Sequence, residues 1–301
     1  MVNLIRFTAM SSFNKLKTLP VDPTVFGSEE IQIIESKTIV PLIKGYIDHI
    51  FSPIKATCDQ DHTPALLKKQ GTASIIGILG GMGPEASLKL LGMVDKKYPN
   101  ATIYLLMITK TPDRTQAILN TTTLEPQEKI HHIFKHASQF LTDLGCQTIL
   151  MPCNTAHYFA KSVKNLTSMV EAISSELKKS NLDSIVVLST QGTRDAKIYA
   201  DLPVNQVITL NDSDQEKITS AIYDEVKANG VTDKAIDLFT DVVKIYYEKG
   251  HTTFGLCCTE LPLIANDHRT AKKLAPYHPT WIDPMVCVVD YLIPNKLISP
   301  S

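Results

Sequence analysis

The sequence lacks the features of a membrane-spanning or nucleic-acid-binding protein. No stretch approaches the roughly 20 consecutive apolar residues of a transmembrane helix. The net charge is −1 over 301 residues, which predicts no basic surface for nucleic acid. Residues 1–18 carry scattered charges and have no continuous apolar segment of the secretory kind. We therefore expect a cytoplasmic protein that binds neither nucleic acid nor a membrane.

The cysteines lack the spacing of a zinc site or a secreted disulfide framework. There are six, and no two of them are separated by two residues. His157 follows Cys153 too closely for the usual finger spacing. Without a secretory segment the thiols are expected to stay reduced. We expect no metal site, and the cysteines are then available for other chemistry.

The residues that are present indicate a soluble α/β protein with two domains. Apolar residues make up 44 % of the chain and charged residues 20 %, which is typical of a globular protein. The predicted strands of the first half span 75–79, 102–108 and 148–151, and its predicted helices span 84–98 and 125–144. This alternation favours a parallel sheet with crossover helices.

A second half repeats the pattern. A predicted strand at 184–188 leads into a polar turn that contains a glycine, and the strand at 75–79, 109 residues earlier, also leads into a glycine turn. A strand followed by a cysteine and a threonine occurs at 149–155 and again, 105 residues later, at 254–259. The further helices of this half are predicted near 195–200, 214–228 and 232–249. We therefore expect two similar domains that face each other.

The domain boundaries follow from these patterns. We expect an N-terminal extension over 1–73, helical in its apolar part and a polar linker from residue 57. The first α/β domain is expected over 74–183 together with 276–301, and the second over 184–275. The last strand and helix, at about 280–293, are expected to cross back to the first domain.

The glycine turn over 81–86 has two interpretations. It satisfies the dinucleotide-binding pattern with alanine in the last place, which would indicate a nicotinamide-dependent oxidoreductase. That pattern also requires an acidic residue at the end of the second strand, and 102–110 contains none. The simpler interpretation is a loop whose backbone N–H groups hold an anion such as a carboxylate.

Two cysteines differ from the others because each follows a strand and precedes hydrogen-bonding residues. Cys153 and Cys258 occupy these positions, one in each half. A Cys–His nucleophile using His157 is one possibility, but it would leave Cys258 unexplained. Two thiols on opposite walls of one cleft suit inversion of a carbon centre, where one removes a proton and the other returns it to the opposite face.

The motifs at 80–85, 152–157 and 258–262, in this order, resemble the aspartate/glutamate racemase superfamily, most closely its aspartate racemase branch. The resemblance covers about residues 74–295. It implies two pseudo-symmetric Rossmann-like domains with the active site between them, an amino-acid substrate, and no pyridoxal phosphate or metal. A homodimer is also expected. Residues 1–73 have no counterpart in this pattern.

The resemblance also implies roles for individual residues. Cys153 and Cys258 correspond to the paired acid/base thiols, and Arg114 and Lys227 to the residues that hold a distal carboxylate. The other implied substrate-binding residues are Met82, Asn154, Thr155, Thr193 and Thr259. The expected activity is racemisation of aspartate or glutamate. A dicarboxylate isomerase or decarboxylase and a non-catalytic amino-acid-binding protein are the alternatives, and the sequence leaves open whether His157 or Glu260 assists the thiols.

Overall fold

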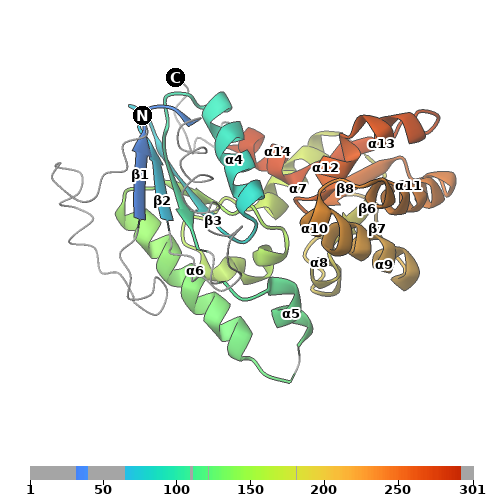
Figure 1. Cartoon of the computed structure of the whole chain (residues 1–301), viewed down its shortest axis with the longest axis horizontal. Helices are drawn as coiled ribbons and strands as arrows, with labels where there is room; N and C mark the ends of the chain where they lie inside the picture. The colour runs from blue at the N-terminus through green and yellow to red at the C-terminus, as the bar shows by residue number, and fades with distance from the viewer. Residues whose placement is uncertain (1–31, 40–64, 109–110, 121, 181, 293–301) are drawn as a thin grey trace.

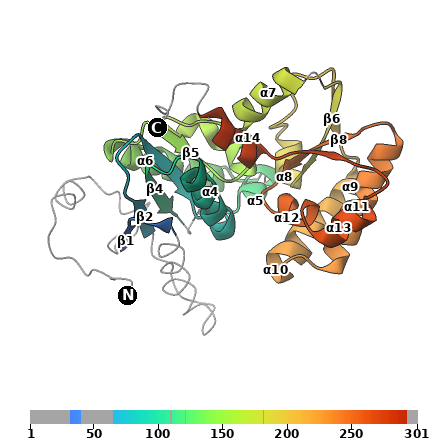
Figure 2. The same cartoon turned by 90° about the horizontal axis from the view of Figure 1, so that it is seen from above.

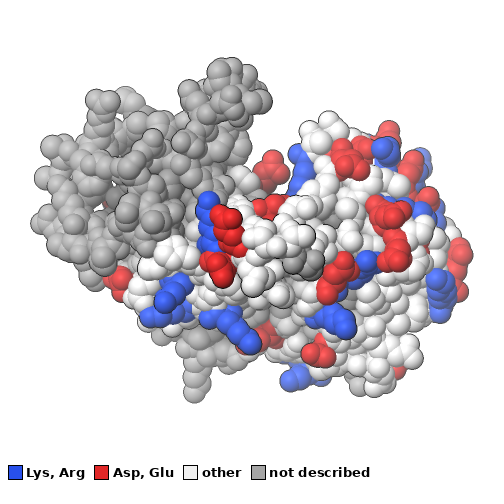
Figure 3. All heavy atoms as spheres, turned by 90° about the horizontal axis from the view of Figure 1, so that it is seen from below, with Lys and Arg blue, Asp and Glu red and all other residues white. Residues whose placement is uncertain are grey.

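The computed structural model describes residues 32–39, 65–108, 111–120, 122–180 and 182–292. Two α/β lobes lie side by side along the long axis, each built around its own sheet (Figures 1 and 2). On the face drawn in Figure 3, basic and acidic side chains are interspersed, as the near-zero net charge predicts. Among these residues no helix combines the length and the apolar character needed to cross a membrane.

The first sheet has five strands in the order β1-β2-β4-β3-β5. They are β1 (Gln32–Ser36), β2 (Ala65–Lys69), β3 (Ile75–Gly80), β4 (Thr102–Met107) and β5 (Thr148–Leu150). The neighbouring strands are parallel except for β2 and β4, which are antiparallel. Strand β3, which lies between β4 and β5, is buried almost throughout, as expected for a strand covered by helices on both faces.

Helices cover both faces of this sheet. Helix α4 (Pro84–Lys97) packs on one face with α14 (Pro284–Tyr291), and α6 (Glu125–Asp143) packs on the other. Helix α7 (Met169–Ser180) contacts the cores of both lobes, because Met169 packs with the first and Ile173 with the second.

The second sheet has four parallel strands in the order β7-β6-β8-β9. They are β6 (Ser184–Ser189), β7 (Gln206–Thr209), β8 (Thr253–Cys257) and β9 (Thr280–Ile282). Its helices include α9 (Asp212–Ser220), α11 (Asp233–Glu248), α12 (Leu261–Ala265) and α13 (His268–Lys273). The three-strand orders β4-β3-β5 and β7-β6-β8 are the same, so the two predicted parallel-sheet halves are confirmed.

One strand, β9, belongs to the second sheet and not to the first lobe as expected. We placed the strand near residue 280 with the first half, but β9 pairs with β8 in the second sheet. Helix α14, which follows it directly, packs against α4 and α7 of the first lobe. The chain therefore crosses back after β9, because a short strand beside β8 gains backbone hydrogen bonds there. The domain boundaries themselves remain a proposal.

The described part of the N-terminal extension contains two strands in segments predicted as a helix and a linker. Strand β1 falls in the apolar run expected to be helical, and β2 falls in the expected linker. Both extend the first sheet beyond β4, so pairing with an available sheet edge overrides the weak local pattern. Residues 1–31 and 40–64 lie outside the described residues.

A buried lysine fastens β2 to the first lobe. The Lys69 side chain, 5 % exposed, forms an ion pair of 3.1 Å with Asp95 of α4. Its ammonium group also donates to the carbonyl of Ala101 at 3.1 Å and to that of Pro99. A buried ammonium requires such partners, since its desolvation is otherwise costly.

Replacing Lys69 by methionine should lower the free energy of unfolding by roughly 2 kcal/mol, because it leaves a carboxylate and two carbonyls without their donor. Chemical denaturation followed by circular dichroism measures this change. Lys96→Met is the matched control, since Lys96 is exposed on the same helix as Asp95. Equal stability of the two variants would show that the lysine does not anchor β2.

Candidate active site

The carboxyl-terminal ends of strands from both sheets meet at one cavity. Its empty volume, including the part open to solvent, is about 380 Å³. The loops after β3, β5, β6 and β8 all contribute to its wall, which is where α/β proteins place ligand sites. Eight of the nine predicted site residues line it: Met82, Arg114, Cys153, Asn154, Thr155, Lys227, Cys258 and Thr259.

The ninth residue lies directly behind the wall. The Thr193 hydroxyl is 2.9 Å from that of Thr155. The lining also includes residues that we did not predict as substrate-binding: Asp113, Thr115, Pro152, Thr190, Tyr223 and Glu260. The structure therefore brings the predicted set together, although its members are separated by up to 177 positions (82 to 259).

The Cys258 thiol is bonded to a carboxylate. Its Sγ donates to Glu260 Oε2 at 2.9 Å, and the Thr259 hydroxyl donates to the same oxygen at 3.0 Å. Burial raises the pKa of the Cys258 thiol well above its usual range, and the negative charge of Glu260 raises it further. At neutral pH this sulfur is therefore a protonated thiol.

A lysine balances the charge of this carboxylate. Lys227 Nζ lies 3.7 Å from Glu260 Oε1 and 4.1 Å from the centre of the Tyr223 ring. Burial works against the Lys227 ammonium, but the opposing effect of Glu260 and its neighbours leaves its pKa above the usual value. Lys227 is thus charged and held by one carboxylate and one aromatic face.

Cys153 is half-buried in the loop after β5, and a histidine holds its backbone. His157 Nδ1 donates to the Cys153 carbonyl at 2.9 Å, while its Nε2 accepts from the Met169 N–H at 3.1 Å. Burial lowers the pKa of His157 to about 4. The His157 ring is neutral, and both of its nitrogens are hydrogen-bonded to backbone groups. His157 therefore positions the loop. The side chain that is hydrogen-bonded to a cavity thiol is instead Glu260.

The burial of His157 makes stability depend on pH. Its pKa is about 6.5 in an unfolded chain and about 4 here, so the unfolded chain gains a proton first as pH falls. The contribution of the neutral His157 ring to the free energy of unfolding is complete above pH 6.5 and is lost as pH falls through 4. We expect wild type to lose about 2 kcal/mol more unfolding free energy than His157→Gln between pH 7 and pH 5. Urea titrations at both pH values test this, and identical losses would contradict it.

Arg114 is fixed at the cavity wall by the start of α5 (Arg114–Leu119), where Asp113 accepts a capping bond of 2.7 Å from the Gln116 N–H. The guanidinium donates through Nη2 to the Met82 carbonyl at 2.7 Å and through Nη1 to the Pro112 carbonyl at 3.1 Å. Its Nε is buried without a protein partner. Arg114 therefore orders the turn around Met82 and keeps one unused donor.

The backbone explains the glycine turn. Gly81 has φ +95°, and a side chain there would come within 2.5 Å of the Ile108 N–H group. The Ser87 hydroxyl accepts from the Gly81 N–H at 3.1 Å and donates to the Gly83 carbonyl at 2.9 Å. Only glycine fits this left-handed, crowded position. The turn directs the Met82 carbonyl towards Arg114.

Buried hydroxyl and amide groups join the two lobes behind the cavity. The hydroxyls of Thr155, Thr190 and Thr193 lie within 2.9–3.1 Å of one another. The Tyr199 hydroxyl donates to Asn154 Oδ1 at 2.5 Å. All five side chains belong to residues no more than 6 % exposed. The sequence predicts Asn154, Thr155 and Thr193 as substrate contacts. In the structure their side chains are hydrogen-bonded across the interface between the lobes.

Two α/β lobes thus meet at a shared cavity that is lined by one thiol from each lobe. Residues 79–292 match the model of the Asp/Glu/Hydantoin racemase family, and the chain belongs to this family. By its membership of this family the protein is an isomerase, an amino-acid racemase.

Solved structures show the same fold. The aspartate racemase of Picrophilus torridus is 26 % identical, with a TM-score of 0.58 over 76 % of this chain and 96 % of its own. An aspartate racemase homologue from Pyrococcus horikoshii is 20 % identical, with a TM-score of 0.56 over 74 % and 98 %. A glutamate racemase of Bacillus anthracis is 16 % identical, with a TM-score of 0.53 over 76 % and 85 %. The resemblance to the racemase superfamily is confirmed.

Proposed function

We propose that the protein racemises aspartate or glutamate without a cofactor, by proton transfer between Cys153 and Cys258. The observation that carries the proposal is that these two thiols come from opposite sheets and line one cavity together with Arg114 and Lys227. Two cations in so small a space suit a substrate with a second carboxylate. The 26 % identity to an aspartate racemase agrees with this choice.

The bonding of Cys258 suggests how one turnover proceeds. Cys258 is a thiol in this state and serves as the acid, so we assign the role of the base to Cys153. The Cys153 thiolate removes the α-hydrogen and becomes a thiol. Cys258 then gives its proton to the opposite face of the carbon and becomes a thiolate. The ionised Glu260, 2.9 Å from that sulfur, is placed to accept the Cys258 proton when the reaction runs the other way, which makes Cys258 the base.

The intermediate carries negative charge that the cavity must stabilise. Charge that leaves the α-carbon moves onto the α-carboxylate, where donors placed in advance lower the barrier. Asn154 and the threonine hydroxyls lie beside Cys153 and are the donors available for that group. Arg114, with its unused Nε, and Lys227 would hold the distal carboxylate. The two ends of the substrate would then be fixed on either side of the reacting carbon.

A circular-dichroism assay with the purified protein tests the proposal. The protein is freed of pyridoxal phosphate and metal and incubated with each enantiomer of aspartate, glutamate, alanine and serine. Interconversion of the acidic amino acids, with little or none of the neutral ones, is the expected result. Conversion of maleate or a malonate derivative without racemisation would instead support the isomerase or decarboxylase alternative. No interconversion of any amino acid would overturn the proposal.

A further inference from the structure

A tyrosine outside the predicted site makes two contacts at the cavity. Tyr223 belongs to η3 (Ala221–Val226), a π-helical turn between α9 and α10 (Lys227–Asn229). The Lys227 N–H donates to the Ile222 carbonyl five residues back. Such turns are rare and frequently occur at functional sites. The turn brings Tyr223 and Lys227 to the same wall of the cavity.

The two contacts of Tyr223 use different parts of its side chain. The ring lies under Lys227 Nζ at 4.1 Å, beside Glu260 and hence beside the Cys258 thiol. The hydroxyl lies 3.0 Å from the Thr115 hydroxyl of α5, which belongs to the other lobe. Tyr223 therefore fixes a cation in its own lobe and bonds to the lobe opposite.

The Tyr223–Thr115 bond differs from the other polar contacts between the lobes. The threonine triangle and the Asn154–Tyr199 pair are formed by residues no more than 6 % exposed, whereas Tyr223 is half-buried at the cavity wall. Helices α5 and α8 (Gln191–Asp195) already approach closely beside this bond, since a side chain at Gly192 would come within 2.8 Å of the Thr115 backbone. An amino acid entering the cavity between the lobes would thus separate Tyr223 from Thr115 and leave the buried contacts intact.

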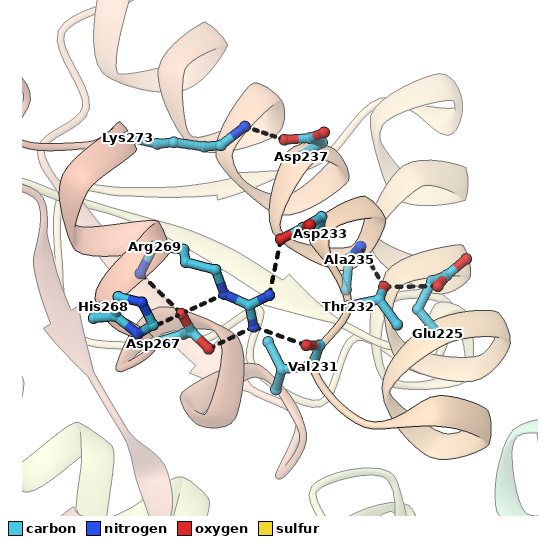
Figure 4. Close-up of polar contacts among 10 residues, drawn as sticks. All are labelled: Glu225, Val231, Thr232, Asp233, Ala235, Asp237, Asp267, His268, Arg269 and Lys273. Carbon is cyan, nitrogen blue, oxygen red and sulfur yellow. Dashed lines mark hydrogen bonds and ion pairs between the residues drawn. The ribbon is translucent and has the colours of Figure 1, made fainter.

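The backbone of η3 is held from the outer side. Glu225 accepts from the Thr232 hydroxyl at 2.7 Å and pairs with Lys234 at 2.9 Å. Figure 4 shows the Glu225–Thr232 contact next to the cluster in which Arg269 binds Asp267, Asp233 and the Val231 carbonyl. These contacts hold the backbone that carries Tyr223 against the start of α11.

We propose that Tyr223 is a positioning residue of the racemase and closes its cavity. Its ring keeps Lys227 next to Glu260 and Cys258, and its hydroxyl bonds to Thr115 when the lobes are closed. The first role rests on the proposed two-thiol function. The closing role concerns access to the cavity and can be tested without racemase activity.

The activity test uses Tyr223→Phe, Thr115→Val and the double variant, which preserve the ring and the side-chain shape. Each single change should lower kcat/KM by about threefold to tenfold, the effect of one neutral hydrogen bond. The double variant should be no worse than either single one, because all three lack the same bond. Tyr223→Leu should lose more, and its pH–rate profile should shift because Lys227 loses its aromatic support. The proposal would be overturned if the losses of kcat/KM in the two single variants multiplied in the double variant. It would also be overturned if the pH–rate profile of Tyr223→Leu matched that of wild type.

The second test measures access directly. Wild type and the two single variants are treated with iodoacetamide, and each cysteine peptide is quantified by mass spectrometry. Cys153 and Cys258 should react faster in both variants, while Cys146 and Cys257, buried away from the cavity, should not change. Unchanged labelling of the cavity cysteines, or faster labelling of all four, would overturn the closing role. If labelling changes as expected and no amino acid is racemised, the closing role stands and the proposed function fails.

Discussion

Replacing either cavity cysteine by alanine should reduce racemisation by about a thousandfold or more. General acid–base groups typically contribute 10²- to 10⁴-fold each, and inversion requires both proton transfers. Cys153→Ala and Cys258→Ala are assayed separately with each pure enantiomer. Cys287→Ala is the matched control, because this thiol is buried in α14 outside the cavity and should retain activity near wild type.

The same two variants distinguish the roles of the thiols. In deuterated water, each retains one thiol that can remove the α-hydrogen of one enantiomer and return deuterium to the same face. Any residual exchange should therefore show opposite enantiomer preferences in Cys153→Ala and Cys258→Ala, as followed by proton NMR. Undiminished racemisation by either variant would rule out the two-thiol mechanism and point to Glu260 as a base, since both nitrogens of His157 are bonded to backbone.

The second large effect is expected for Arg114. Arg114→Ala should lower kcat/KM for aspartate roughly 10- to 150-fold, which corresponds to a charge-assisted contact of about 1.5–3 kcal/mol. A neutral amino acid should also lose activity, because Arg114 holds the Met82 carbonyl at 2.7 Å whatever the substrate. The difference between the two losses measures its contribution to reading the distal carboxylate.

A matched control for this measurement is Arg194→Ala. Arg194 is paired with Asp195 and Asp212 and does not line the cavity. The Arg194→Ala variant should leave the activities on aspartate and on the neutral amino acid near wild type. If Arg114→Ala reduces aspartate and a neutral amino acid by the same factor, Arg114 supports the cavity wall and does not select the substrate.

Most regular elements could be predicted because their patterns are strong. The buried strand at 75–79, the proline-started helix after it and the glycine-ended helix at 125–144 match β3, α4 and α6 within one or two residues. Short elements gave weaker signals. Strand β2 carries Lys68 and Lys69, and its pairing partner β4 lies more than thirty residues away. The segment 65–69 is identified as a strand by its pairing with β4, which the local sequence does not show.

The site could be predicted as far as its residues belong to local motifs. Cys153, Cys258 and Arg114 lie in short stretches with recognisable order, and all three line the cavity. Tyr223 and Thr115 were missed because their contact joins residues 108 positions apart. The helix expected at 214–228 also concealed the π-helical turn, since no residue type marks an i→i−5 bond.

Strand β2 has a consequence for any shortened form of the protein. The family match begins at residue 79, after β2, so a version trimmed to the shared region would lack both β1 and β2. The backbone groups of β4 that now bond to β2 would face water along a five-residue edge. An unpaired, apolar edge of that kind is a template for association between molecules. We therefore expect strand β2 to protect this edge, and chains trimmed before β3 should form higher-order aggregates more readily than the full chain.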